Sequence, residues 1–165
     1  MLRRLNPTRP RVHGSDHVNA GEDPIPFALI FIDSKETDSS ELTSSTTETT
    51  LQTITLPPNS FDKILIEFGY QARFEANVNS RCDYTWRVKV GTTTVKTFYN
   101  RIIASATTGI ASGNRISGQY SAIYQGGNNS PLTVSITGQM SVSDPSCGMR
   151  VHYLRIFGIN KSLRP

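Results

Sequence analysis

Residues 132–142 read Leu-Thr-Val-Ser-Ile-Thr-Gly-Gln-Met-Ser-Val, so that apolar residues or glycine alternate with polar residues over the whole stretch. A period of two places successive side chains on opposite faces of an extended strand, one toward a core and one toward water. The polar face holds hydroxyl groups and one amide and carries no charge. The stretch therefore predicts a strand in a half-buried antiparallel sheet.

The same pattern continues on both sides of this strand. Turn sequences such as Pro57-Pro58-Asn59 and residues 125–131 separate the extended segments at intervals of about 10 residues, and no segment has a helical period. We therefore predict an all-β fold, a single β-sandwich or jelly roll of about eight antiparallel strands. Further strands are predicted at residues 27–33, 46–56, 63–68, 72–78, 84–90, 95–103, 115–124 and 149–159.

Two of these predicted strands depart from simple alternation. Residues 27–32 are wholly apolar, which is typical of a strand covered on both faces, here by the preceding segment or by a neighbouring molecule. The last strand alternates at first and then becomes apolar on both faces, which predicts a bulge or a central position in its sheet. Residues 46–56 follow a long Ser/Thr/Glu loop and are expected to form an edge strand.

Residues 1–26 have a different composition from the rest of the chain. They contain Pro7, Pro10, Pro24 and Pro26 and few large apolar residues, which predicts an extended arm in front of a sandwich domain at residues 27–165. The net charge of +4 is only mildly basic, but this arm carries Arg3, Arg4, Arg9 and Arg11. These arginines could bind phosphates of a nucleic acid, dock on a neighbouring subunit, or make no ordered contact.

The two cysteines, Cys82 and Cys147, are too few for a disulfide scaffold and form no Cys-x-x-Cys motif. A bridge between them would close a loop of more than sixty residues and stabilise the fold by roughly 4 kcal/mol in the chain-entropy model. The alternative is a pair of independent buried thiols. Sequence does not show whether the two Cα atoms come close enough for a bridge.

No arrangement of residues points to an enzyme. Serines and threonines are spread along strand faces without a nucleophile elbow, and Glu67, Glu75 and Asp83 are expected on solvated faces rather than as a glycosidase pair. His13 and His17, with Asp16, form a cluster of possible metal ligands, but no fourth ligand is near, so we expect no metal site and no cofactor.

The remaining histidine and the aromatic residues have simpler interpretations. His152 falls on the polar face of the last strand and is expected to be exposed. Aromatic residues that stack on sugars or bases would be exposed, whereas residues that alternate with polar neighbours usually belong to the core. We therefore expect a core position for Trp86, Tyr99, Tyr120 and Tyr124. The apolar run at residues 27–32 is too short to cross a bilayer, and the amino terminus lacks the apolar region of a secretory signal.

An arginine- and proline-bearing arm on one eight-stranded body resembles the small jelly-roll proteins of virus particles, both coat subunits and decoration proteins. The resemblance implies a non-enzymatic structural protein of the virion, a homo-oligomer whose partners are copies of itself or a major capsid protein, with no membrane contact. The arm has no lysine, unlike RNA-packaging arms, which favours anchoring to neighbours over genome contact. The alternative is a carbohydrate- or receptor-binding module that uses the loop at residues 125–130.

Overall fold

The structure is a computed structural model that describes residues 27–58, 61, 63–75, 80–104, 114–126 and 130–161. None of these residues forms a helix that is long and apolar enough to span a membrane. The described residues form nine strands: β1 (Phe27–Lys35), β2 (Leu42–Thr43), β3 (Thr49–Leu56), β4 (Lys63–Phe74), β5 (Ser80–Val90), β6 (Thr93–Ala104), β7 (Asn114–Gln125), β8 (Leu132–Met140) and β9 (Cys147–Lys161).

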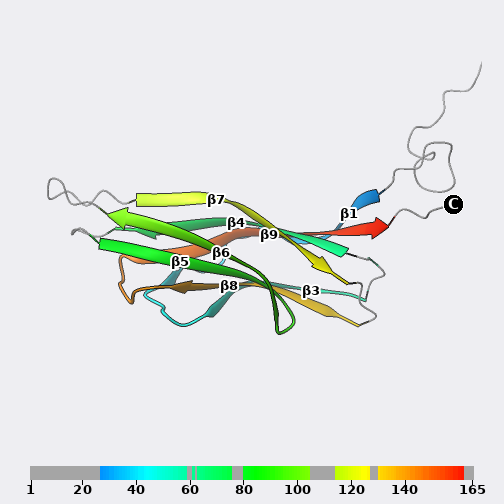
Figure 1. Cartoon of the computed structure of the whole chain (residues 1–165), viewed down its shortest axis with the longest axis horizontal. Helices are drawn as coiled ribbons and strands as arrows, with labels where there is room; N and C mark the ends of the chain where they lie inside the picture. Colours follow the sequence, from blue (N-terminus) through cyan, green and yellow to red (C-terminus); the bar gives the residue numbers. More distant parts are fainter. Residues whose placement is uncertain are drawn as a thin grey trace, which may run out of the picture.

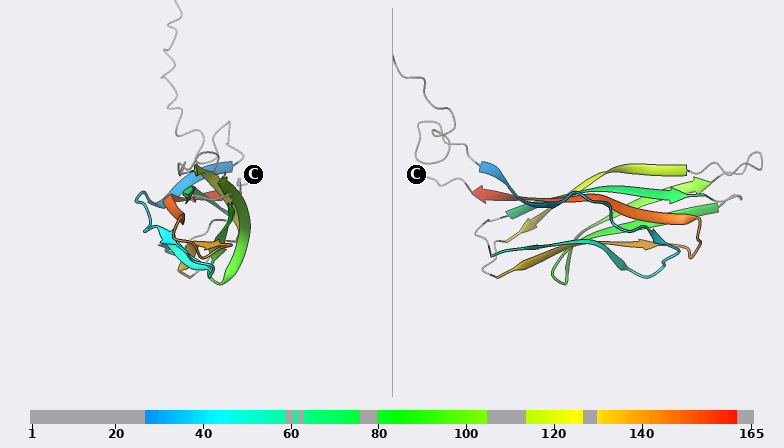
Figure 2. Two further views of the ribbon diagram at one scale, coloured as in Figure 1. Left: turned by 90° about the vertical axis from the view of Figure 1, so that its left-hand side faces the viewer. Right: turned by 180° about the vertical axis from the view of Figure 1, so that it is seen from behind.

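The strands make two antiparallel sheets that pack face to face. One sheet has the order β1-β9-β4-β7, with the short β2 also paired to β9, and the other has the order β3-β8-β5-β6. The strands run along the long axis of the sandwich (Figure 1), and the end-on view separates the two layers (Figure 2, left). The fold is therefore the predicted all-β sandwich.

The pairing of the eight long strands gives a jelly roll. In chain order the first four pair with the last four in reverse, β1 with β9, β3 with β8, β4 with β7 and β5 with β6. A chain folded back on itself in this way and rolled into two sheets is the jelly-roll arrangement. Among the described strands, β5 and β6 alone form a hairpin of adjacent strands, and every other pair joins segments far apart in the sequence.

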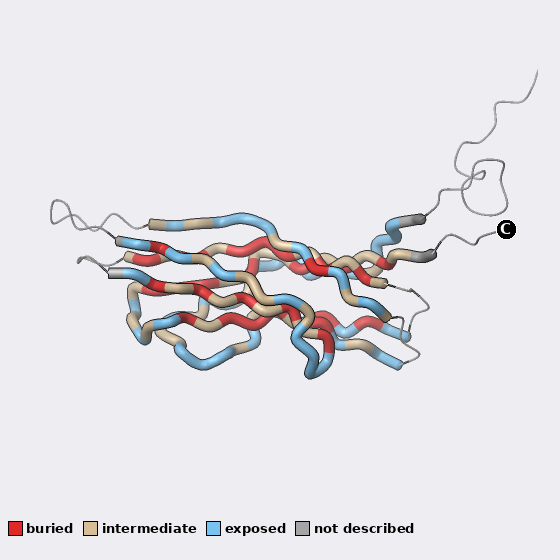
Figure 3. The backbone as a smooth tube through the Cα atoms, viewed as in Figure 1, coloured by how far each residue is buried: buried red, intermediate tan, exposed pale blue. Residues whose placement is uncertain are grey.

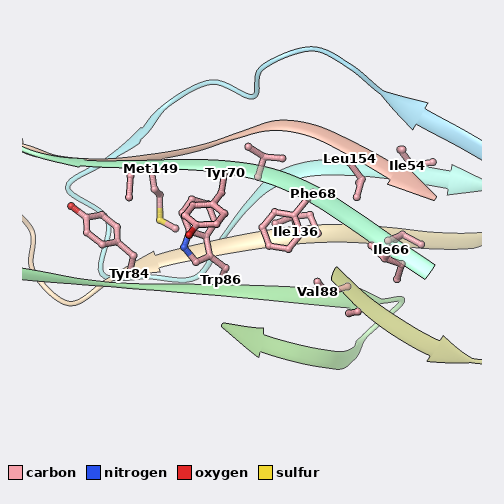
Figure 4. Packing of buried hydrophobic residues seen from close by; sticks show 14 of the residues in the cluster. Ile54, Ile66, Phe68, Tyr70, Tyr84, Trp86, Val88, Ile136, Met149 and Leu154 are labelled. Carbon is pink, nitrogen blue, oxygen red and sulfur yellow. The ribbon is translucent and has the colours of Figure 1, made fainter. Parts of the chain in front are cut away.

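The core lies between the sheets and follows the alternation of the sequence. In β8, Val134, Ile136 and Met140 are buried while the polar residues between them, Thr137 excepted, are at least partly exposed. Buried and exposed positions alternate along most strands (Figure 3), and side chains from both sheets meet in the middle (Figure 4). Trp86 is fully buried there, and its indole Nε1 donates a hydrogen bond to Asn100 Oδ1 at 2.9 Å.

Two predictions about individual strands are confirmed. β3 is an edge strand of its sheet, as residues 46–56 were expected to be. β9 is central, since it pairs with both β1 and β4, and its pairing with β4 shifts register between Gly69 and Tyr70 at a bulge. The predicted strands at 63–68 and 72–78 are one strand, β4, as far as Phe74. The strand continues through Gly69. A glycine suits this position, because the Tyr153 ring occupies the space where a side chain of residue 69 would lie.

Among the described residues no element covers both faces of residues 27–32, and a cover by the preceding segment or by a neighbouring molecule stays a prediction. β1 lies at the edge of the five-stranded sheet, and Leu29, Ile30 and Phe31 are exposed. The central position in the sheet is taken by β9, which the nested pairing places between β1 and β4. Within the described part of the chain, the most apolar strand is therefore left open to water.

Candidate assembly surface

The exposed strand β1 is the first element of a candidate assembly surface. The exposed fractions of Leu29 and Phe31 are 53% and 56%, on the outer face of the sheet, and that of Ile30 is 42%, on the opposite face. Large apolar side chains at this level of exposure are unremarkable when scattered, but three in succession on one strand form a patch. β1 therefore presents apolar groups on both of its faces.

Three neighbouring strands extend this patch across the outer face of the five-stranded sheet. Phe31 is opposite Phe157 of β9, Phe157 is opposite Leu65 of β4, and Leu65 is opposite Ile123 of β7. We call these four residues the apolar row. The rings of Phe31 and Phe157 make an edge contact with centroids 5.8 Å apart, and Ile123 is 52% exposed. The row is an apolar band across the full width of the sheet.

The backbone of β1 is open on its outer side. Among the described residues its strand partner is β9 alone, so the N–H and C=O groups that point away from β9 have no strand to pair with. Near the end of the strand, the carbonyl of Lys35 accepts a hydrogen bond from the Gln52 side chain at 3.3 Å, and the Ser34 N–H donates to Asp33 Oδ1 at 2.8 Å. An unpaired strand edge is a template for another strand.

One charged group beside the apolar row, the Arg155 guanidinium, is paired within the chain. Arg155, in β9 two residues before Phe157, holds Glu36 with Nε–Oε1 at 2.8 Å, and its guanidinium lies 4.4 Å from the centroid of the Tyr153 ring. The hydrogen bond from Arg155 keeps the pKa of Glu36 below its usual range. An approaching apolar surface would therefore meet a charge that is already compensated.

A second surface feature lies on the outer face of the four-stranded sheet. Asp83 and Thr85 of β5 and Tyr99, Asn100 and Arg101 of β6 line a shallow hollow, which we call the Tyr99 hollow. Arg101 Nε lies 2.5 Å from Asp83 Oδ1, and this contact lowers the pKa of Asp83. The hollow therefore combines a compensated ion pair with an exposed aromatic ring.

Tyr99 is the aromatic residue whose core position was predicted wrongly, since 72% of its surface is exposed. Its neighbours Phe98 and Asn100 face inward, whereas the outward face of β6 holds Thr97, Tyr99 and Arg101. Because side chains alternate between the two faces of a strand, an outward Thr97 or Arg101 would have predicted an outward Tyr99 as well. The core position of Trp86 is confirmed, while Tyr120 and Tyr124 are partly buried against the core.

The other predicted site residues fall into two groups. His152 is not simply exposed, because its Nδ1 lies 2.9 Å from Asp38 Oδ1. Glu75 forms ion pairs with Arg73 at 3.3 Å and with Arg115 at 3.1 Å. The arm residues Arg3, Arg4, Arg9, Arg11, His13 and His17 lie outside the described residues.

Cys82 and Cys147 are free thiols, fully buried in the same core cluster. Burial raises the pKa of the Cys147 thiol to about 12. A disulfide between them stays a prediction. Within the described part of the chain, no group of three or more His, Cys, Asp or Glu side chains could hold a metal ion.

Sequence reasoning had missed the apolar row, although each member left a local signal. Three members of the row lie on the outward face of their strands, where alternation predicts a polar residue: Leu65, Ile123 and Phe157. Apolar residues on the outward parity of three strands indicate a covered outer face, but only the strand order shows that they are neighbours. The row therefore becomes visible only with the pairing of β1, β9, β4 and β7.

No protein-family model matches this sequence, and no curated protein matches it. Among solved structures, the crystal structure of dimeric latent PorU from Porphyromonas gingivalis is similar, with a TM-score of 0.49 and 9% sequence identity. The alignment covers 88% of this chain but only 14% of the PorU chain, so the described sandwich corresponds to a small part of that protein. Similarity at this level says nothing about what the chain does.

Proposed function

We propose that this protein is a non-enzymatic structural protein of a virion, either a shell subunit or a capsid-decoration protein. It assembles with copies of itself or with a major capsid protein through β1 and the apolar row. The observation that carries the proposal is the exposure of Leu29, Ile30 and Phe31 on a strand whose outer edge has no strand partner among the described residues.

The free energy of hydration favours association at this surface. Full burial of a Leu, Ile or Phe side chain contributes about 1.5–3 kcal/mol, and Leu29, Phe31 and Ile123 each have about half of their surface still to bury. Pairing of the β1 backbone edge adds hydrogen bonds and fixes the register of the contact. Together the apolar row and the open edge favour a specific contact over nonspecific hydrophobic association.

A second copy of the chain suits this surface. Two β1 strands that pair antiparallel about a two-fold axis would join two five-stranded sheets into one, and the same residues would serve on both sides. The interface would bring the apolar rows of both copies into one band. The arm at residues 1–26 precedes β1 directly, so Arg3, Arg4, Arg9 and Arg11 belong to a segment tethered at the interface and within reach of the neighbouring subunit.

The jelly-roll topology supports a virion role at the level of the fold. Viral capsid subunits are among the proteins built on double-sheet jelly rolls, as are lectins. Because one fold hosts many functions, topology alone does not separate these classes. The assembly surface favours the first class, since a repeated contact between copies is what a shell requires.

The change Phe31→Glu tests the assembly surface. It places a charge at the junction of β1 and the apolar row, and we expect it to convert oligomers of the full-length protein into monomers. The matched control is Ile103→Glu, which places the same charge on a side chain 63% exposed in β6, at the edge of the other sheet. Mass photometry and light scattering across a concentration series would measure the change. A wild-type protein that is monomeric at high concentration would overturn self-assembly.

The contribution of the arm needs a separate comparison. A chain that begins at Asp23 lacks all four arm arginines but retains β1. If the arm anchors neighbours, this chain assembles more weakly than the full-length protein, and the difference persists when nuclease has removed nucleic acid. If the difference disappears after nuclease treatment, the arm acts by binding nucleic acid and not by anchoring neighbours. If neither chain self-assembles or binds a purified shell, the virion proposal fails.

The Tyr99 hollow favours one alternative, a carbohydrate- or receptor-binding module. An exposed tyrosine beside the Asp83–Arg101 pair combines a flat apolar face with polar groups, as sugar-binding surfaces do. The predicted sugar loop at residues 125–130 includes residues 127–129, which lie outside the described residues. Glycan-array binding that Tyr99→Ala abolishes and Phe31→Glu preserves would promote this alternative.

A further inference from the structure

A pair of buried cysteines joins the two sheets at the end of the sandwich opposite the apolar row. Cys82 lies in β5 of the four-stranded sheet, and Cys147 is the first residue of β9 in the five-stranded sheet, opposite Phe74 of β4. Both thiols are completely buried in the same core cluster, and Tyr84, next but one to Cys82, contacts the Arg73 carbonyl beside Phe74, the strand partner of Cys147. Phe157 of the apolar row lies near the other end of β9, so the two features are independent.

The surrounding hydrogen bonds hold the two cysteines in place. Tyr84, two residues after Cys82, donates its hydroxyl to the Arg73 carbonyl at 2.5 Å, which ties β5 to the end of β4. The backbone of Asp83 is bonded to Ser141 in both directions, each at 2.9 Å. On the other side, the Cys147 amide donates to the Asp144 carbonyl at 2.9 Å. The cysteines therefore lie at the same end of the core on anchored strands rather than on loose loops.

We propose that Cys82 and Cys147 form an intramolecular disulfide that clamps the two sheets together when the chain folds in the presence of a disulfide oxidant such as oxidised glutathione. One cysteine thiolate attacks a glutathione sulfur and expels a glutathione thiolate, which leaves a mixed disulfide. The thiolate of the second cysteine then attacks the protein sulfur and expels the other glutathione. The two cysteines lose two protons and two electrons, and the oxidant becomes two glutathione thiols.

The structure also determines when this bridge can form. In the folded, reduced protein both sulfurs are out of reach of a solvent oxidant. The Cys147 pKa of about 12 keeps the thiol protonated at neutral pH, and the thiolate is the reactive form. Oxidation is therefore slow once the sandwich has closed and rapid while the chain is still open. The same burial protects a completed bridge from reductants.

A bridge at this position would constrain the unfolded chain strongly. The cysteines stand roughly 65 residues apart, a span that includes all of β6, β7 and β8. In the chain-entropy account, closing a loop of this length raises the thermal midpoint of a domain of this size by on the order of 10 °C. The stabilisation comes mainly from the unfolded state, so the folded structure changes little.

The test compares one sequence in two redox states. Full-length protein is unfolded in denaturant and refolded either with a reduced and oxidised glutathione mixture or with excess dithiothreitol. We expect the first sample to lose about 2 Da, to give one peptide pair that links Cys82 to Cys147 after digestion, and to melt on the order of 10 °C higher. Protein folded under dithiothreitol and then exposed to oxidised glutathione should acquire the bridge far more slowly.

Matched variants complete the design. Cys82→Ala and Cys147→Ala each leave one thiol, and their thermal midpoints should be the same under both refolding conditions. Because the main comparison uses the unmodified sequence, it stands even if a variant folds poorly. Oxidative refolding that leaves two free thiols, or that links cysteines of different chains, would overturn the proposal. Neither result bears on assembly through β1, which the Phe31→Glu comparison tests separately.

Discussion

At the scale of single residues, several buried acids have pKa values above their usual range. Burial raises the pKa of the Cys147 thiol and of the Tyr120 phenol to about 12 in each case. Burial also raises the pKa of Tyr84. These groups are neutral in the folded protein at ordinary pH, which suits an apolar core that would pay a large solvation penalty for their charged forms.

These pKa values predict that alkali destabilises the reduced protein. A group whose pKa is higher in the folded state than in the unfolded state stabilises the fold below its unfolded pKa, and this contribution disappears as the pH rises. For Cys147 the loss begins near the ordinary thiol value of 9.0 and continues toward 12. We expect the free energy of unfolding, measured by urea titration under reductant, to fall from pH 9 upward.

The variant Cys147→Ala isolates the contribution of this thiol. It removes one titrating group and should therefore lose less stability over the same pH interval than the wild-type protein, whatever its starting stability. Equal slopes for variant and wild type between pH 9 and 11 would show that the Cys147 thiol does not contribute.

At the scale of elements, a stack of three aromatic rings closes one side of the sandwich. Tyr120 of β7 lies between Phe98 of β6, with ring centroids 4.2 Å apart, and Tyr70 of β4, with centroids 4.5 Å apart. β6 and β7 are the edge strands of different sheets and do not pair with each other. The stack therefore joins the two sheets where no backbone hydrogen bonds do so.

Removal of the central ring should open this side of the molecule. We expect Tyr120→Ala to destabilise the fold by about 2–3 kcal/mol, because a partly buried aromatic ring and two ring contacts are lost. Hydrogen exchange should accelerate in β6 and β7 more than in β3 and β8. Tyr99→Ala is the matched control, since Tyr99 is exposed, and it should change the stability by less than about 0.5 kcal/mol. A uniform increase in exchange would contradict the local role of the stack.

At the scale of the whole molecule, the nested strand order makes nearly every pairing long-range. β1 cannot pair until β9 has been reached, and β3 must wait for β8, so chain entropy is lost before most contacts form. β5 and β6 can form a hairpin early, because only a two-residue turn joins them. The topology therefore predicts that the β5–β6 hairpin forms rapidly and that the rest of the fold forms slowly.

Trp86 offers a direct measurement of folding speed. It is the single tryptophan of the chain, and it is fully buried between the sheets. We expect stopped-flow refolding, followed by the fluorescence of Trp86, to take milliseconds to seconds or longer, as in other sandwiches dominated by non-local pairing. Recovery of the native signal within the microsecond range would contradict this expectation.

Much of the fold could be predicted because strand periodicity is local. Residues 132–142 and 84–90 alternate along the chain, and most side chains predicted to face the core are buried, although Leu132 and Val142 are only partly buried and Thr137 is buried against expectation. The bulge and central position of β9 were also visible, as a change of period within one segment. Predictions failed where the decisive neighbour was remote. Residues 27–32 have the composition of a covered strand but form an edge among the described strands.

The sequence by itself determined that this protein is an all-β sandwich, because alternation and turn residues act between near neighbours on the chain. Only the tertiary structure decided that β1 is an edge strand, that four outward apolar residues form one row, and that Cys82 and Cys147 lie at the same end of the core. Those relations join residues tens of positions apart. They depend on which strands pair, and the pairing is chosen by packing of the whole molecule rather than by any segment alone.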